Sequence, residues 1–152
     1  MIVQRIPLPD LEATTSFGAQ IAEVLRPGDV IALSGGLGAG KTTLARAIIA
    51  ALGHVGEVPS PSFASVETYD PPLVRLPLVH ADFYRLTRPE EAEEIGLDDY
   101  RQGAALLAEW PENAGGFAFE PACLSIMLET SANGRIAIVE PGADWLGRMP
   151  WM

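Results

Sequence analysis

The chain has 152 residues, of which 48% are hydrophobic and 20% are charged, a composition typical of one globular domain and too apolar for a disordered chain. The formal net charge of −10 argues against autonomous binding to nucleic acid, because phosphates attract basic surfaces. No apolar run reaches the roughly 20 residues of a membrane helix, no signal peptide is recognisable, and the single cysteine, Cys123, excludes an internal disulfide. We therefore expect one cytoplasmic domain over 1–152 without membrane association.

Strands and helices are predicted to alternate along the chain, which is typical of an α/β sheet. Helices are assigned where apolar residues recur at three- and four-residue spacing, and strands where short apolar runs are bounded by Pro or Gly. The turn-forming residues 131–134 lie between the last two strands, which predicts a closing β-hairpin. In chain order the predicted elements are an apolar-rich segment at 2–8, a helix at 14–25, a strand at 30–33, a helix at 42–52, a loop at 56–62, strands at 64–69 and 76–84, an acidic helix after Pro89, a strand at 104–108, and hairpin strands at 124–128 and 135–139.

Residues 35–42 fit the phosphate-binding pattern G-x-x-x-x-G-K-[ST] at every fixed position, between a predicted strand and a predicted helix. Glycines let the backbone curl so that N–H groups face an anion, and the first turn of the helix adds its own free N–H groups. Lys41 would supply positive charge to the β- and γ-phosphates, and the Thr42 hydroxyl would be a ligand for Mg²⁺. The predicted nucleotide-binding residues of the loop are Gly35, Gly36, Leu37, Gly38, Ala39, Gly40, Lys41, Thr42 and Thr43.

This motif sets the expected fold class. We predict an α/β P-loop NTPase fold with a mostly parallel sheet and a C-terminal antiparallel hairpin. A P-loop alone binds a nucleotide, whereas hydrolysis also needs an acid to hold the metal and a group to orient water.

Two carboxylates lie where the apolar runs of predicted strands end and are candidates for those roles. Asp82 comes after 78–81, and Glu109 comes after 104–108. Ligands bind at the carboxyl ends of strands in open α/β sheets, so both acids are expected to reach the site, and by form alone either fits the Walker-B role. His80 shares a strand face with Asp82 and is either a water-orienting group or a hydrogen-bonded structural histidine.

Short motifs occur in a fixed order across most of the chain, from Ile6 to about Arg135. In this order they resemble the bacterial TsaE (YjeE) family, ATPases required for threonylcarbamoyladenosine modification of tRNA. The motifs are I-P-L-P-D at 6–10, G-A-G-K-T-T at 38–43, S-P-S-F at 60–63, H-A-D-F-Y-R-L at 80–86, E-W-P at 109–111 and G-R at 134–135.

The resemblance implies roles for individual residues. Thr42 and Glu109 would hold Mg²⁺, while Asp82 would be catalytic with Lys41 and Ser60. From composition alone, the loop containing Ser60 is an ordinary turn. The remaining implied nucleotide-binding residues are Leu11, in the N-terminal segment expected near the adenine, Trp110, which is also needed for activity, and Arg135.

Two departures from the family pattern bear on the site. Gly36 stands where the family usually has Asp, which leaves binding intact and makes the effect on turnover an open question. Ser62 replaces the usual Thr and keeps the hydroxyl.

The resemblance implies an accessory ATPase that uses ATP and Mg²⁺ to reset the TsaB–TsaD complex, which modifies adenosine 37 of tRNA. The chain would not transfer threonylcarbamoyl itself and would meet tRNA only indirectly through the complex. One alternative is a small-molecule P-loop kinase, but the arginines after Thr42 form no clustered lid. The other is a GTPase, whose N-K-x-D motif cannot occur because Lys41 is the single lysine.

Overall fold

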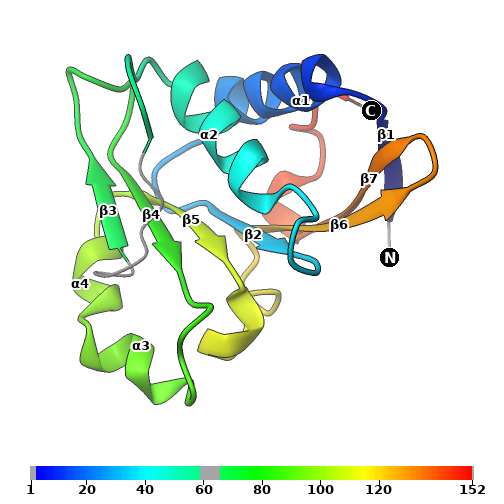
Figure 1. Cartoon of the computed structure of the whole chain (residues 1–152). Helices are drawn as coiled ribbons and strands as arrows, with labels where there is room; N and C mark the ends of the chain where they lie inside the picture. Colours follow the sequence, from blue (N-terminus) through cyan, green and yellow to red (C-terminus); the bar gives the residue numbers. More distant parts are fainter. Residues whose placement is uncertain (1–2, 59–65, 152) are drawn as a thin grey trace.

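The computed structural model describes residues 3–58 and 66–151 (Figure 1). Its described elements, in chain order, are β1 (Gln4–Leu8), α1 (Leu11–Val24), β2 (Val30–Ser34), α2 (Lys41–Ala51), β3 (Val66–Tyr69), β4 (Leu78–Asp82), α3 (Glu90–Glu94), α4 (Leu97–Arg101), β5 (Ala105–Glu109), the 3₁₀ helix η1 (Pro111–Ala114), β6 (Cys123–Ser131), β7 (Gly134–Pro141) and the 3₁₀ helix η2 (Ala143–Trp145). The strands form one sheet in the order β1-β7-β6-β2-β5-β4-β3.

The sheet is mixed, so the prediction of a mostly parallel sheet is wrong. Strands β6, β2, β5 and β4 run parallel to one another, whereas β1–β7, β7–β6 and β4–β3 are antiparallel pairs. The connection 70–77 between β3 and β4 is shorter than the dozen or more residues that a parallel crossover needs, so β3 runs in the opposite direction. At the other edge the predicted hairpin is confirmed, and β1 pairs with its reversed strand β7.

Element boundaries differ from the predictions where capping residues act. Helix α1 begins at Leu11 rather than at 14, because the Asp10 carboxylate accepts a hydrogen bond of 2.8 Å from the Ala13 N–H and caps the helix. The acidic stretch after Pro89 contains two short helices, α3 and α4. They are separated at Gly96, whose φ of 80° is left-handed and ends helical geometry.

The two faces of the sheet have different covers. Helices α1 and α2 lie together over one face, whereas α3, α4 and the segment before β6 lie on the other (Figure 1). Alternate residues of β5 accordingly enter different cores: Leu107 packs with the α1–α2 side, and Leu106 with the other. Glu109 follows Leu107 in this alternation, and its side chain therefore points toward α2.

Helices in the described ranges fall short of what a bilayer span requires, either in length or in apolar character.

Candidate functional site

The loop between β2 and α2 has a backbone that only glycine fits at two positions. Gly35 has a φ of 136°, and a Cβ there would lie 2.4 Å from the Leu128 carbonyl oxygen on β6. Gly40 has a φ of 102°, and a Cβ there would lie 2.9 Å from the Arg135 side chain on β7. Positive φ and close approach act together at both positions, so the loop is shaped from outside by the hairpin as well as by its own sequence.

Lys41 lies folded back into the loop. The residue is 6% exposed, and Nζ donates hydrogen bonds of 2.7 Å to the carbonyl oxygens of both Gly35 and Gly36. The ammonium also lies 4.3 Å from the centre of the Trp110 ring. Burial lowers the pKa of Lys41, against the attraction of neighbouring carboxylates, of which Glu109 acts most strongly. The loop thus holds a largely desolvated cation that an incoming anion would stabilise.

Glu109, at the end of β5, joins three elements. Its side chain is almost fully buried, Oε1 accepts a hydrogen bond of 2.8 Å from the Thr42 hydroxyl on α2, and Oε2 lies 2.6 Å from His80 Nε2 on β4. His80 is 0% exposed, and its Nδ1 has no hydrogen-bond partner among the described residues. The contact agrees with the alternative of a hydrogen-bonded structural histidine. It also fixes the orientation of the carboxylate.

Asp82 lies directly beside Glu109, since the two residues are paired in the parallel register of β4 and β5. The Tyr84 N–H donates a hydrogen bond of 2.9 Å to Asp82 Oδ1. Burial raises the pKa of Asp82, and the negative charge of Glu109 adds to the rise, while the Tyr84 N–H acts in the opposite direction. A carboxylate with a raised pKa in an open site is suited to accept a proton.

The loop and the strand ends enclose a cavity of about 340 Å³. A smaller cavity of about 180 Å³ adjoins it, shares Gly40, Thr43 and Arg135 with it, and extends to Leu11 at the start of α1. Arg135 Nη2 donates a hydrogen bond of 3.0 Å to the Gly38 carbonyl oxygen where the two cavities meet. The larger cavity is lined by Leu37, Gly38, Gly40, Lys41, Thr42, Thr43, Asp82, Tyr84, Glu109, Trp110 and Arg135.

Comparison with known proteins identifies the family of the chain. The family model described as "Threonylcarbamoyl adenosine biosynthesis protein TsaE" matches residues 8–137. The chain belongs to the TsaE family. It is 38% identical to the tRNA threonylcarbamoyladenosine biosynthesis protein TsaE of Haemophilus influenzae over 115 residues, which cover 72% of each chain.

Two further relatives support the assignment to TsaE. The protein of the same name from Synechocystis is 42% identical over 110 residues, covering 69% of this chain and 68% of that one. The crystal structure of YdiB from Bacillus subtilis superposes with a TM-score of 0.69 at 28% identity, covering 94% of this chain and 86% of that chain.

Within this TsaE site, two aromatic residues lie against the lysine and the catalytic candidates. Trp110 has a φ of 56° and is the single non-glycine residue with positive φ in the ranges 3–58 and 66–151. This strained backbone turns the ring toward Lys41, and the Tyr84 ring lies 5.0 Å from it. Tyr84 was not predicted as a site residue. The available signal was its position two residues after Asp82, where its N–H can reach the carboxylate.

The structure places most of the predicted TsaE site residues together. Ten of the larger cavity's residues were predicted from sequence, all except Tyr84, and Leu11 lines the adjoining cavity. Gly35, Gly36 and Ala39 instead face a depression beside β6. Ser60 lies outside the described residues, and the individual roles of the residues stay predictions.

Proposed function

We propose that this TsaE-family chain is a Mg²⁺-dependent ATPase of tRNA threonylcarbamoyladenosine biosynthesis. Its role would be accessory: it would act on the TsaB–TsaD complex, reach tRNA only indirectly, and leave the transfer of threonylcarbamoyl to its partners. The names of its relatives support the pathway, and the net charge of −10 favours contact with protein over contact with tRNA. The observation that carries the ATPase proposal is the Thr42–Glu109 hydrogen bond beside the buried Lys41.

The donor atoms at this bond fit Mg²⁺. A threonine hydroxyl and a carboxylate are hard oxygen ligands, and Mg²⁺ at nucleotide sites takes one or two such ligands and completes its shell with phosphate and water oxygens. Thr42 and Glu109 would hold the ion, which, when bound, would neutralise charge on the β- and γ-phosphates. The hydrogen bond from His80 keeps the Glu109 carboxylate aimed at Thr42.

The other residues would bind the nucleotide and handle the proton. Lys41 and the loop N–H groups would hold the phosphates, and the smaller cavity beside Leu11 would take the base. Asp82 would accept a proton from the attacking water on Oδ2, while the Tyr84 N–H holds Oδ1 and orients the carboxylate. The hydroxide so formed would attack the γ-phosphorus, and ADP would leave.

Lys41→Ala tests the nucleotide site. The variant is expected to lose MgATP binding in isothermal titration calorimetry, because the loop then lacks its positive charge. Arg46→Ala on the same helix is the matched control and should bind as the wild type does. Tight MgATP binding by Lys41→Ala would refute the assigned role.

The partner assignment needs a separate measurement. Purified chain is expected to co-purify with TsaB–TsaD, and its phosphate release is expected to rise when the complex is added. Absence of both effects would refute this part of the proposal and leave the nucleotide site intact.

A further inference from the structure

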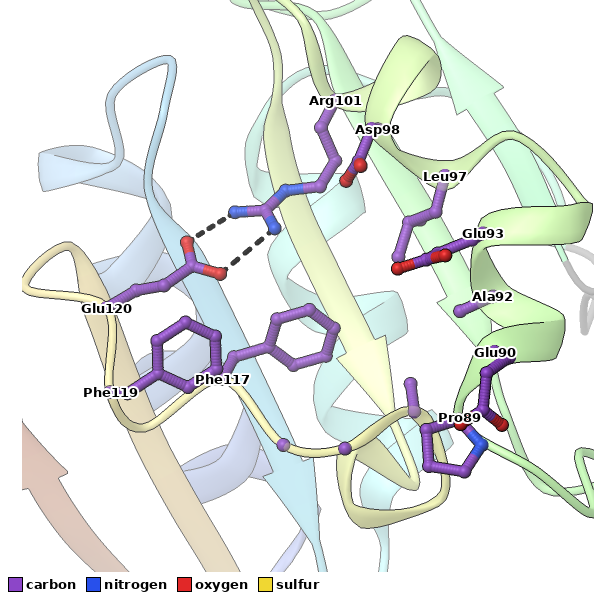
Figure 2. Close-up of a pocket in the computed structure, with 13 residues that line it drawn as sticks. Pro89, Glu90, Ala92, Glu93, Leu97, Asp98, Arg101, Phe117, Phe119 and Glu120 are labelled. Carbon is purple, nitrogen blue, oxygen red and sulfur yellow. Dashed lines mark hydrogen bonds and ion pairs between the residues drawn. The ribbon is translucent and has the colours of Figure 1, made fainter.

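A second groove lies on the opposite face of the sheet from α1 and α2. It has a volume of about 370 Å³ and is bounded by α3 and α4 on one side and by the segment 114–120 on the other (Figure 2). Its apolar part consists of the buried residues Ala92, Leu97 and Phe117. Phe119, at the rim, is 80% exposed, an unusual placement for a large aromatic side chain.

The charge of this groove is strongly negative. Glu90, Glu93 and Asp98 line its helical side, and none of them forms an ion pair within the described part of the chain. Arg101 is the single cation among the described lining residues. Both its terminal nitrogens are taken up by Glu120, at 3.0 and 2.6 Å, so it does not neutralise the other three carboxylates (Figure 2).

The groove is connected to the nucleotide site through its walls. One wall begins at Pro89, on the segment that leaves β4 after Asp82, and the other follows η1, which leaves β5 after Trp110. Asn113 of η1 ties the two segments together, since its Nδ2 donates hydrogen bonds of 3.1 and 3.3 Å to the carbonyl oxygens of Phe83 and Tyr84. An occupant that moved either wall would therefore act on the segments that carry the strand-end residues.

We infer that this groove is the docking site for a basic segment of a partner protein. An arginine or lysine of the segment pairs with the carboxylates of Glu90, Glu93 and Asp98, and a neighbouring apolar side chain packs on Phe117 and Phe119. The same carboxylates repel the phosphates of nucleic acid and of anionic membranes, which leaves a protein segment as the occupant. The inference rests on the proposed function for the identity of the partner, TsaB–TsaD.

Two variants of the full chain test the groove, each with a matched control. Glu90→Lys/Glu93→Lys reverses the helical rim, and Glu23→Lys/Glu140→Lys makes the same charge change at exposed positions elsewhere. Phe119→Ala removes the exposed ring without altering a helix, and Leu146→Ala removes an exposed apolar side chain away from the groove. Circular dichroism and thermal melting check that all four variants are folded. Binding of immobilised TsaB–TsaD is measured by biolayer interferometry at low and high salt.

The charge reversal is expected to raise the Kd for TsaB–TsaD by about a hundredfold, chiefly through a slower association rate, and to remove the salt dependence of that rate. Phe119→Ala is expected to raise the Kd by about thirtyfold, as for an aromatic anchor. Both controls should bind like the wild type, and all variants should bind MgATP unchanged.

Wild-type affinity in both groove variants, or an equal loss in the matched controls, would overturn the inference. A wrong assignment of the partner would give a different result. The wild-type chain itself would then not bind TsaB–TsaD, and TsaB–TsaD could not be the occupant of the groove.

Discussion

Strands β4 and β5 run side by side, and each ends in a carboxylate, but the two acids have different surroundings. Glu109 is 1% exposed and holds hydrogen bonds to both Thr42 and His80. Asp82, its partner in register, is only partly buried and is oriented by one backbone N–H, that of Tyr84. The position of an acid at the end of a strand therefore does not decide its role. The hydrogen bonds distinguish the two acids: under the proposed function they would fix Glu109 in place for a metal and leave Asp82 an oxygen free to accept a proton.

The largest expected effect comes from replacing each of the two acids with its amide, because the two substitutions should have different consequences. Asp82→Asn should lower phosphate release by about 10²–10⁴-fold and leave MgATP binding intact, because a proton acceptor is lost and no ligand is. Glu109→Gln should instead raise the Mg²⁺ concentration needed for binding of a fluorescent ATP analogue. Identical Mg²⁺ titration curves for the two variants would remove the distinction between the strand ends.

His80 tests how the Glu109 carboxylate is held. His80→Ala should weaken the apparent Mg²⁺ affinity by about 10–100-fold, as is typical when the hydrogen bond behind a ligand is removed. His80→Gln, which retains a side-chain N–H donor, should recover part of the loss. His54→Ala removes the other histidine of the chain and should leave the Mg²⁺ titration unchanged. If His54→Ala and His80→Ala weaken it equally, the effect is not due to Glu109.

The two acids should also differ in their effect on stability. Burial raises the pKa of Asp82 above its ordinary 3.8, so the native state is favoured by protonation. That contribution is complete below the unfolded-state pKa and is lost as pH rises through the native-state pKa. Asp82→Asn should therefore raise the melting temperature at pH 7, with a gain that disappears toward pH 3, since Asn still accepts the Tyr84 N–H.

Glu109→Ala provides the contrast in the same melting experiments. It leaves the buried His80 Nε2 without its partner and should lower the free energy of unfolding by about 1–3 kcal/mol. Equal melting shifts of the same sign for Asp82→Asn and Glu109→Ala at pH 7 would contradict the different environments of the two acids.

The smallest expected effect comes from Gly36→Asp, which adds a third carboxylate in the loop after β2, the strand beside β5. Gly36 has no atom within 4 Å of a Cβ position and no positive φ, so Gly36→Asp should change unfolding free energy by about 0.5 kcal/mol or less. Its exposed charge should alter MgATP affinity by about fivefold or less. Gly35→Asp is the matched control and should unfold the chain, since its Cβ meets the Leu128 carbonyl oxygen. Comparable stability of both variants would refute this reading of the loop.

The site could be predicted from the sequence wherever a local rule fixes geometry. The glycine pattern predicted a tightly curled loop, although contacts with the hairpin also shape it, and the strand-end rule placed Asp82 and Glu109 in one cavity. The pairing of β1 with β7 could not be predicted from local patterns, because it joins residues far apart in the chain. The antiparallel pairing of β3 with β4 did have a local signal that was not used, namely the short connection between the two strands. Strand-end position alone left the roles of the two acids open, and the family resemblance supplied their proposed division. The contacts that distinguish the two acids come from Thr42 and His80, which reach Glu109 from two other elements.

Other features were missed for local reasons. Asp10 is a favoured capping residue and could have indicated where α1 begins. The apolar spacing alone placed the start of this helix later in the chain. No sequence pattern indicated the positive φ of Trp110, because tryptophan is among the residues least expected in the left-handed region. The role of Ser60 stays a prediction, since the residue lies outside the described ranges.

The contacts of the phosphate loop with the hairpin have a consequence for the order of events during synthesis. The carbonyl of Leu128 borders Gly35, and the Arg135 guanidinium holds the Gly38 carbonyl oxygen, although some ninety residues separate each pair along the chain. A nascent chain that has left the ribosome only as far as β5 carries the full glycine pattern and both strand-end acids, yet it lacks these two supports. We expect the loop to reach its native shape only once β6 and β7 have been synthesised and have packed against it, so any competence to hold a nucleotide would arise only after these two strands.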